Sequence, residues 1–284
     1  MSNVAEFLLR AQNPDGGWGY RVGGMSYVEP TSTVLLALNN AHARTRGRDF
    51  LLSLQHVDGG WGIAASDSES GWMTAWAVRA LAELPDTHAA IRRGANWLIR
   101  NAGLVIRDES ARAKIKQLFK IDSTLRGWPW QPGDAAWVQP TALTLLALVA
   151  AAQSDHPRVR EGVQYLFDRA CPDGGWNIGN PWMLDKQIPS TIQDTAVALL
   201  ALRAVGESSN DARVSAAIRF LREAVARAQT SAELAWGAYA LKEWGVPTSD
   251  ALQRLNGLQR ADGSWEGNPF ITAIAWLALL ELGK

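Results

Sequence analysis

A four-residue phrase, Asp-Gly-Gly-Trp in its fullest form, recurs along this chain and constrains its fold more than any other feature. It is centred on Trp18, Trp61, Trp176 and Trp265. Downstream, an Ala-Leu pair recurs six times in one register, and a threonine lies six residues before the alanine in five of these cases. These register positions are Thr31, Thr74, Thr141, Thr195, Leu234 and Thr272. Such self-similarity is the signature of a repeat architecture, so the chain is predicted to contain six related units.

Each unit is predicted to form a helical hairpin. The first helix carries an aromatic-Leu pair, as in Phe7-Leu8, and ends at Asp-Gly-Gly, where glycine supplies the positive φ that closes a helix. The second helix starts near the threonine and is apolar nearly all round, which is typical of helices buried on several sides. Polar capping units, which an open array needs, are not evident in the sequence. The expected fold is therefore all-α: a single (α/α)6 barrel, or toroid, over residues 1–284, with an inner ring of helices inside an outer ring.

Residues 104–125 interrupt the repeat as an insertion. Within them, 111–121 places Ile115, Leu118 and Phe119 at helical spacing, with basic residues on the other side. A basic amphipathic helix can contact a membrane surface peripherally, cover a site as a lid, or pack on its own domain. All three interpretations stay open for this segment.

Composition excludes several classes of protein. The 28 basic and 28 acidic residues leave no net charge, which removes the electrostatic argument for nucleic acid as a partner. The single Cys171 excludes a disulfide framework and suits a reducing compartment. No stretch approaches the ~20 apolar residues needed to cross a bilayer, and the first residues lack the basic region of a signal peptide. A cytoplasmic location is expected, and no particular oligomeric state is predicted.

The first two units carry the pattern Phe-Leu-x-x-x-Gln-x-x-Asp-Gly-Gly-Trp, over 7–18 and 50–61. This pattern resembles the Gln-Trp repeat of squalene-hopene and oxidosqualene cyclases, within the superfamily of terpenoid cyclase and protein prenyltransferase α/α toroids. The resemblance covers nearly the whole chain. It implies that Gln12, Gln55 and Gln259, with the tryptophans of their phrases, join one hairpin to the next outside the barrel. The fourth unit departs from the pattern with Ala170 in place of glutamine, and the third replaces the phrase over 126–137.

The resemblance also implies a site at the start of the inner helices. Protonation-initiated cyclases carry Asp-x-Asp-Asp-Thr there, and the nearest match is 191–195, in which Gln193 replaces the middle acid. Glutamine cannot protonate an alkene. Asp194 remains, either as a first-turn carboxylate satisfied by backbone N–H groups or as an acid in a dry site. Glu29 and Glu233 lie at matching positions, so the candidate proton donors are Asp194, Glu29 and Glu233, and solvated first-turn residues are the alternative.

An aromatic wall is predicted around this mouth. The long loops 127–138 and 177–190 contribute Trp128 and further tryptophans, and inner-helix residues four positions along extend the same face. The candidate ligand-binding residues are Trp72, Met73, Trp76, Trp130, Trp137, Gln139, Trp182, Gln193, Trp236 and Phe270. Aromatic faces can stabilise a carbocation, but they can equally pack beneath proline-rich loops.

The resulting hypothesis is a protein that binds an isoprenoid or a similar apolar small molecule and cyclises or isomerises it with an unusual acid. The alternative is a non-catalytic toroid that binds a lipid or a protein partner, since Gln193 has replaced the usual acid. Protein prenyl transfer, a third option implied by the resemblance, needs zinc held by Asp, Cys and His. The four histidines lie in polar segments away from the inner helices, so neither a metal nor another cofactor is expected.

Overall fold

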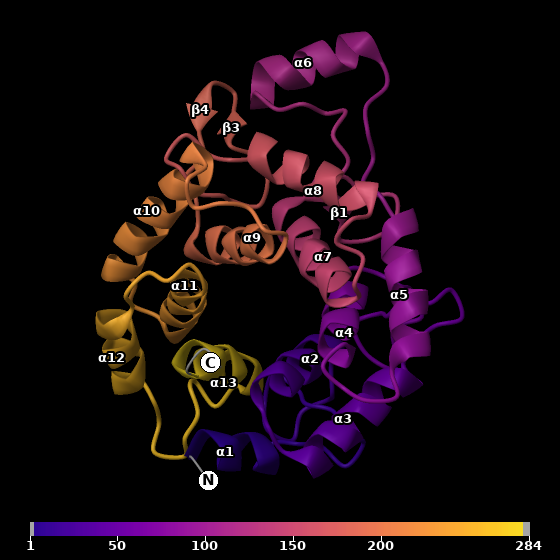
Figure 1. Ribbon diagram of the computed structural model, residues 1–284, viewed down its shortest axis with the longest axis vertical. Helices are drawn as coiled ribbons and strands as arrows, with labels where there is room; N and C mark the ends of the chain where they lie inside the picture. The colour runs from indigo at the N-terminus through magenta and orange to yellow at the C-terminus, as the bar shows by residue number, and fades with distance from the viewer. Residues whose placement is uncertain (1–2, 281–284) are drawn as a thin grey trace.

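The computed structural model describes residues 3–280, and within them twelve helices form two concentric rings (Figure 1). The outer helices are α1 (Asn3–Arg10), α3 (Ala41–Ser53), α5 (His88–Arg100), α8 (Pro157–Asp168), α10 (Ala212–Arg227) and α12 (Ser249–Gly257). The inner helices are α2 (Val28–Ala37), α4 (Met73–Leu81), α7 (Val138–Ala150), α9 (Ile192–Ala204), α11 (Ser231–Glu243) and α13 (Pro269–Leu279). Each inner helix packs on the next in this order, and α13 packs on α2. The predicted all-α toroid is confirmed.

The two rings differ in how much of each helix they bury. In α9, every residue from Thr195 to Leu202 is buried, because the helix is covered by its ring neighbours and by outer helices. In α10, burial is limited to one face, at Val214, Ala217, Leu221 and Val225. An amphipathic helix buries only its apolar stripe, so sequence polarity sorts the helices between the rings.

The repeated tryptophan and threonine hold each hairpin together. In the second unit, Nε1 of Trp61 donates to the carbonyl of Leu51 at 2.7 Å, and the backbone N–H of Trp61 donates to Oγ1 of Thr74 at 2.9 Å. The same two bonds recur at Trp18, Trp128, Trp176 and Trp265. The fifth unit, which has Leu234 in place of threonine, also lacks the tryptophan. We call these five tryptophan–threonine pairs the staples.

Trp128 is a correction to the sequence analysis, which placed it in the aromatic wall of the mouth. It is buried, and its indole N–H donates to the carbonyl of Leu98 at 2.7 Å. The third unit loses the Asp-Gly-Gly-Trp phrase but keeps the spacing of 13 residues from tryptophan to threonine that the first two units show. In this third unit the spacing, and not the phrase, was the signal for the staple.

Glutamine and glycine link the first two staples to the following outer helix. Nε2 of Gln12 donates to the carbonyl of Ala43 in α3 at 2.9 Å, and Gln55 makes the equivalent bond to α5. The facing helix carries glycine where the indole packs: a Cβ at Gly47 or Gly94 would lie 2.8 Å from Cζ3 of the neighbouring tryptophan. These contacts support the structural role that the resemblance implied for Gln12 and Gln55, and sequence reasoning missed the glycines.

The insertion forms one further helix, α6 (Glu109–Phe119), which lies outside the ring beyond α8 (Figure 1). Two short antiparallel hairpins lie in the long loops: β1 (Trp128–Pro129) pairs with β2 (Ala136–Trp137), and β3 (Trp182–Met183) pairs with β4 (Lys186–Gln187). Strand β3 packs against α6. Across residues 3–280, none of the helices has the length and apolar character required to cross a membrane.

Candidate functional site

The amino-terminal ends of inner helices α7, α9 and α11 meet at one mouth of the barrel, where a pocket of about 410 Å³ opens. Its lining residues are Trp130, Gln139, Ile178, Thr191, Ile192, Gln193, Asp194 and Glu233. Five of the residues predicted from the sequence therefore meet here: Trp130, Gln139, Gln193, Asp194 and Glu233. Glu29 does not line this pocket.

Asp194 and Glu233 share the pocket but differ in their hydrogen bonds. Asp194 is half-buried and accepts a hydrogen bond from the Thr191 hydroxyl at 2.8 Å; burial raises the pKa of its carboxyl, and this bond opposes the rise. Glu233 forms a capping box with Thr230, whose hydroxyl donates to its carboxylate at 2.9 Å. This bond and two backbone N–H donors hold the pKa of Glu233 below its usual value. Glu233 is therefore a poor proton donor.

Glu29 has the driest surroundings of the three candidate acids. It lies in the first turn of α2, is 8% exposed, and accepts a hydrogen bond from the Tyr20 hydroxyl. Burial raises the pKa of Glu29, and Tyr20 and the indole of Trp76 reduce that rise. Nε1 of Trp76 is buried and forms no hydrogen bond of ordinary geometry within the described residues. A carboxyl of this kind keeps its proton at higher pH than usual, as a general acid requires.

Tyr20 is the partner that sequence reasoning did not assign to Glu29. The backbone N–H of Tyr27 donates to the carbonyl of Trp18 at 2.9 Å, so residues 18–27 fold back as a hairpin and bring Tyr20 to the start of α2. Burial, with the neighbouring Glu29, raises the pKa of Tyr20 and keeps its phenol protonated. The hairpin follows the staple phrase directly, which is the one local signal for this contact.

Aromatic side chains fill the lumen beneath the mouth. Phe270 of α13 contacts Trp76 of α4 at 6.5 Å and Trp236 of α11 at 6.4 Å between ring centroids, and all three are buried. Farther along the same helices, the Arg79 guanidinium donates to the Tyr239 hydroxyl at 3.2 Å. Helices α4 and α11 are three places apart in the six-helix ring, so this bond crosses the barrel. The predicted wall is thus a plug of packed aromatic rings.

The remaining predicted residues lie in three places. Trp72 packs edge-to-face on Trp130, with 4.5 Å between ring centroids, so it borders the mouth. Met73 is buried at the start of α4. Trp137 lines a different pocket beneath α6, and Trp182 lies in β3, which packs on α6. The long loops therefore divide their tryptophans between the mouth and α6.

One cluster holds the residue types of a nucleophilic triad. Ser70 donates to Asp58 at 2.8 Å and lies 2.9 Å from Nδ1 of His56. The first unit holds the same arrangement with Asn13 and Ser26, and asparagine cannot act as the base. The set therefore belongs to the repeat structure. Among residues 3–280, no three His, Cys, Asp or Glu side chains are grouped to hold a metal ion.

Known proteins share both the sequence pattern and the fold. The family model of the squalene-hopene cyclase C-terminal domain matches residues 1–102. The squalene-hopene cyclase of Zymomonas mobilis is 26% identical over 219 residues, which are 69% of this chain and 33% of that protein. The enzyme of Bradyrhizobium diazoefficiens is 36% identical over 171 residues, which are 60% of this chain and 18% of that protein. The chain thus matches a third or less of the length of these curated relatives.

The structural match extends over nearly the whole chain. The type II terpene cyclase MstE from Scytonema superposes with a TM-score of 0.67 and 17% identity, covering 98% of this chain and 95% of that one. At this identity the likeness shows the fold alone. The family model adds a likeness in sequence to squalene-hopene cyclases over residues 1–102. Together, the two kinds of match place this chain in the terpenoid cyclase-like superfamily of α/α toroids.

Proposed function

We propose that this chain binds an isoprenoid or a similarly apolar ligand at the mouth of the toroid and that Glu29 protonates it. The observation that carries the proposal is a buried carboxyl with a raised pKa among aromatic rings. A further support is that structures of MstE hold geranylgeranyl dihydroxybenzoate as substrate and merosterolic acid A as product. Asp194, also with a raised pKa, is the second candidate acid.

The proposed reaction is an isomerisation: the proton that is added to the ligand is later lost from it, so the product has the same composition as the substrate. The Glu29 carboxyl gives its proton to one carbon of an alkene, whose π electrons form the new C–H bond and leave a cation on the adjacent carbon. Attack by a second double bond of the ligand closes a ring and moves the cation. Loss of a proton to a carboxylate restores a double bond. The faces of Trp76, Trp236 and Phe270 stabilise the cation, and their packing excludes water.

The ligand has to reach Glu29 past the aromatic plug. Glu29 does not line the mouth pocket, and Phe270 and Trp76 lie beside it and its partner Tyr20. Productive binding therefore requires one of these rings to move. The ligand then extends from the mouth pocket to Glu29 through the space that the moved ring leaves, and the remaining rings pack around it.

The test is incubation with farnesyl, geranylgeranyl and squalene substrates, followed by gas chromatography. Glu29→Gln keeps the size of the side chain and removes the proton, so turnover is expected to fall by about 10²–10⁴-fold. The matched control is Glu223→Gln, at an exposed position of the outer helix α10. Full activity of Glu29→Gln would refute Glu29 as the acid, and loss in Asp194→Asn alone would assign the proton to Asp194.

Two observations favour a non-catalytic toroid as the second candidate. Gln193 stands where the resemblance places the cyclase acid, and Trp76, Trp236 and Phe270 fill the lumen. Such a protein would retain an apolar ligand at the mouth without converting it. Binding of the same substrates with unchanged mass and retention time supports this candidate over the enzyme.

A further inference from the structure

A second, strongly apolar pocket of about 350 Å³ lies between α6 and the barrel, outside the mouth. Its walls are formed by Ile106, Ile115, Phe119, Ile121, Leu125 and Trp137. On the barrel side, the pocket ends on Tyr165 of α8 and on Arg169, the residue that caps this helix. Its volume is within the range of about 300–1,000 Å³ of small-molecule sites.

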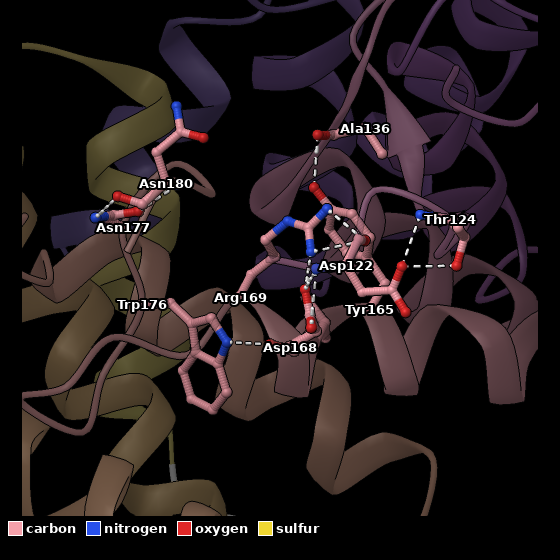
Figure 2. Close-up of polar contacts among 10 residues, drawn as sticks. Asp122, Thr124, Ala136, Tyr165, Asp168, Arg169, Trp176, Asn177 and Asn180 are labelled. Carbon is pink, nitrogen blue, oxygen red and sulfur yellow. Dashed lines mark hydrogen bonds and ion pairs between the residues drawn. The ribbon is translucent and has the colours of Figure 1, made fainter. Parts of the chain in front are cut away.

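The Tyr165 hydroxyl and the Arg169 guanidinium at the floor already have partners in the protein (Figure 2). The Tyr165 hydroxyl donates to the carbonyl of Ala136 at 2.5 Å, and burial raises the pKa of this phenol to about 12. The Arg169 guanidinium lies over the Tyr165 ring, pairs with the Asp168 carboxylate and donates to the carbonyl of Asp122. The charge of Arg169 is balanced by Asp168, so a ligand at this floor needs no ionic group.

Helix α6 covers the pocket without filling it. None of its residues is buried, and Ile115 and Phe119 remain half-buried although they face the pocket. The helix has 11 residues, and isolated helices shorter than about 12–15 residues are marginal in water. It is held by its Asp108 cap, by contact with β3 and by the Lys120–Asp185 ion pair at 3.0 Å. An apolar occupant would complete the burial of its inner face.

We propose that this pocket binds an uncharged hydrocarbon chain, of isoprenoid or acyl type, at a site separate from the mouth. Three features favour such a ligand: the apolar walls, the polar groups at the floor that already have protein partners, and the half-buried side chains of α6 that face the pocket. The site has its own reporter. Trp137, at the end of β2, lines this pocket, whereas Trp130, just after β1, lines the mouth.

The test measures quenching of tryptophan fluorescence by a brominated dodecanol, because bromine quenches only nearby indoles. Quenching is expected to decrease in Trp137→Phe and to persist in Trp130→Phe. Ile115→Asp places a charge against the apolar walls and should weaken binding roughly tenfold or more. Leu118→Asp is the matched control, since Leu118 lies on the same helix, is 37% exposed and does not line the pocket. Circular dichroism checks that both variants fold, and α6 buries no residue that the ring needs.

Competition experiments distinguish the two possible types of hydrocarbon ligand, isoprenoid and acyl. Competition by farnesol or by unbrominated dodecanol supports the site and identifies the isoprenoid or the acyl type. Equal weakening by Ile115→Asp and Leu118→Asp overturns it, as does binding only to phosphatidylglycerol vesicles, which would indicate a membrane contact through residues 111–121. Quenching confined to Trp130 also overturns it. Glu29→Gln should leave this binding unchanged, so the result is independent of the proposed function.

Discussion

The staples and the mouth use the same inner helices in opposite ways. At each of the five staples, the tryptophan backbone N–H meets a threonine hydroxyl at 2.8–3.0 Å, so one solution is repeated around the ring. The position two residues before each threonine, or before Leu234 in the fifth unit, lies at the mouth end of an inner helix. Its residue changes from unit to unit: Glu29, Trp72, Gln139, Gln193, Ala232 and Phe270. Repeated residues maintain the fold, and residues that vary from unit to unit are free to form a site.

The mouth itself is not uniform. Glu29 and Glu233 both lie in the first turn of an inner helix. Glu233 satisfies the backbone of its helix and keeps a lowered pKa, whereas burial raises the pKa of Glu29. Glu233 thus stabilises the fold, as the staples do. Glu29 is a carboxyl whose burial disfavours its ionised form, and such a shifted pKa is typical of functional groups.

The largest expected effect comes from removing a staple tryptophan. Trp61→Ala deletes a fully buried indole and its hydrogen bond to the carbonyl of Leu51, so the free energy of unfolding should fall by about 3–5 kcal/mol. Trp130→Ala removes a half-buried ring and one aromatic pair, worth about 0.5–1.5 kcal/mol. Urea unfolding measures both. Equal decreases in the free energy of unfolding would contradict the distinction between a structural staple and a mouth residue.

A staple threonine should contribute less than its tryptophan. Thr74→Val removes the acceptor of the buried Trp61 N–H and should cost about 1–3 kcal/mol. Thr33→Val is the control, because the buried Thr33 hydroxyl donates only to carbonyls of its own helix, at Glu29 and Pro30. We expect a smaller loss there in the same urea assay. A larger loss at Thr33 would contradict the role of the staple hydrogen bond.

Glu233→Ala tests whether this mouth residue is structural. Loss of the capping box should lower the free energy of unfolding by about 0.5–2 kcal/mol at neutral pH. Because folding lowers the pKa of Glu233, its electrostatic contribution is present above the unfolded pKa and is lost as the pH falls through the folded pKa. The difference from the unchanged protein should shrink in acid. If the stability difference between the two proteins grew in acid instead, the lowered pKa of Glu233 would be contradicted.

Glu29→Gln should change stability in the opposite direction. Folding raises the pKa of Glu29, so the unchanged protein loses stability as the pH rises from the unfolded pKa, about 4.3, through the folded one. The variant lacks this penalty and is expected to be the more stable protein at neutral pH. The two curves should converge below about pH 4. A less stable variant at neutral pH would argue that the ionised carboxylate is part of the fold.

The smallest effect is expected on the pH profile of any turnover. Activity of an acid catalyst falls as the pH rises through its pKa. Tyr20→Phe removes a hydrogen-bond donor that lowers the pKa of Glu29. The pH at which activity falls, which is the alkaline limb of the profile, should therefore move to a higher value. Tyr239→Phe, deeper in the barrel, is the control and should leave the limb in place. An unchanged limb in Tyr20→Phe would separate Glu29 from the reaction.

The sequence by itself determined the six hairpins, their closure and the structural role of the tryptophans in the repeated phrase, because these follow from patterns that recur within each unit. Trp128 escaped because its phrase changed while its distance to Thr141 did not. The candidate acids were also found, since Glu29, Asp194 and Glu233 occupy related positions in the repeat.

Only the tertiary structure decided which acid is dry and where the loop tryptophans lie. The pKa of a carboxyl depends on groups that surround it in space, and those around Glu29 come from a separate hairpin and from α4. Likewise, Trp137 and Trp182 lie towards α6 because the insertion packs on their loops, which no spacing in the repeat encodes. Local patterns fix a repeat, but the chemistry of its site depends on contacts between segments distant in the chain.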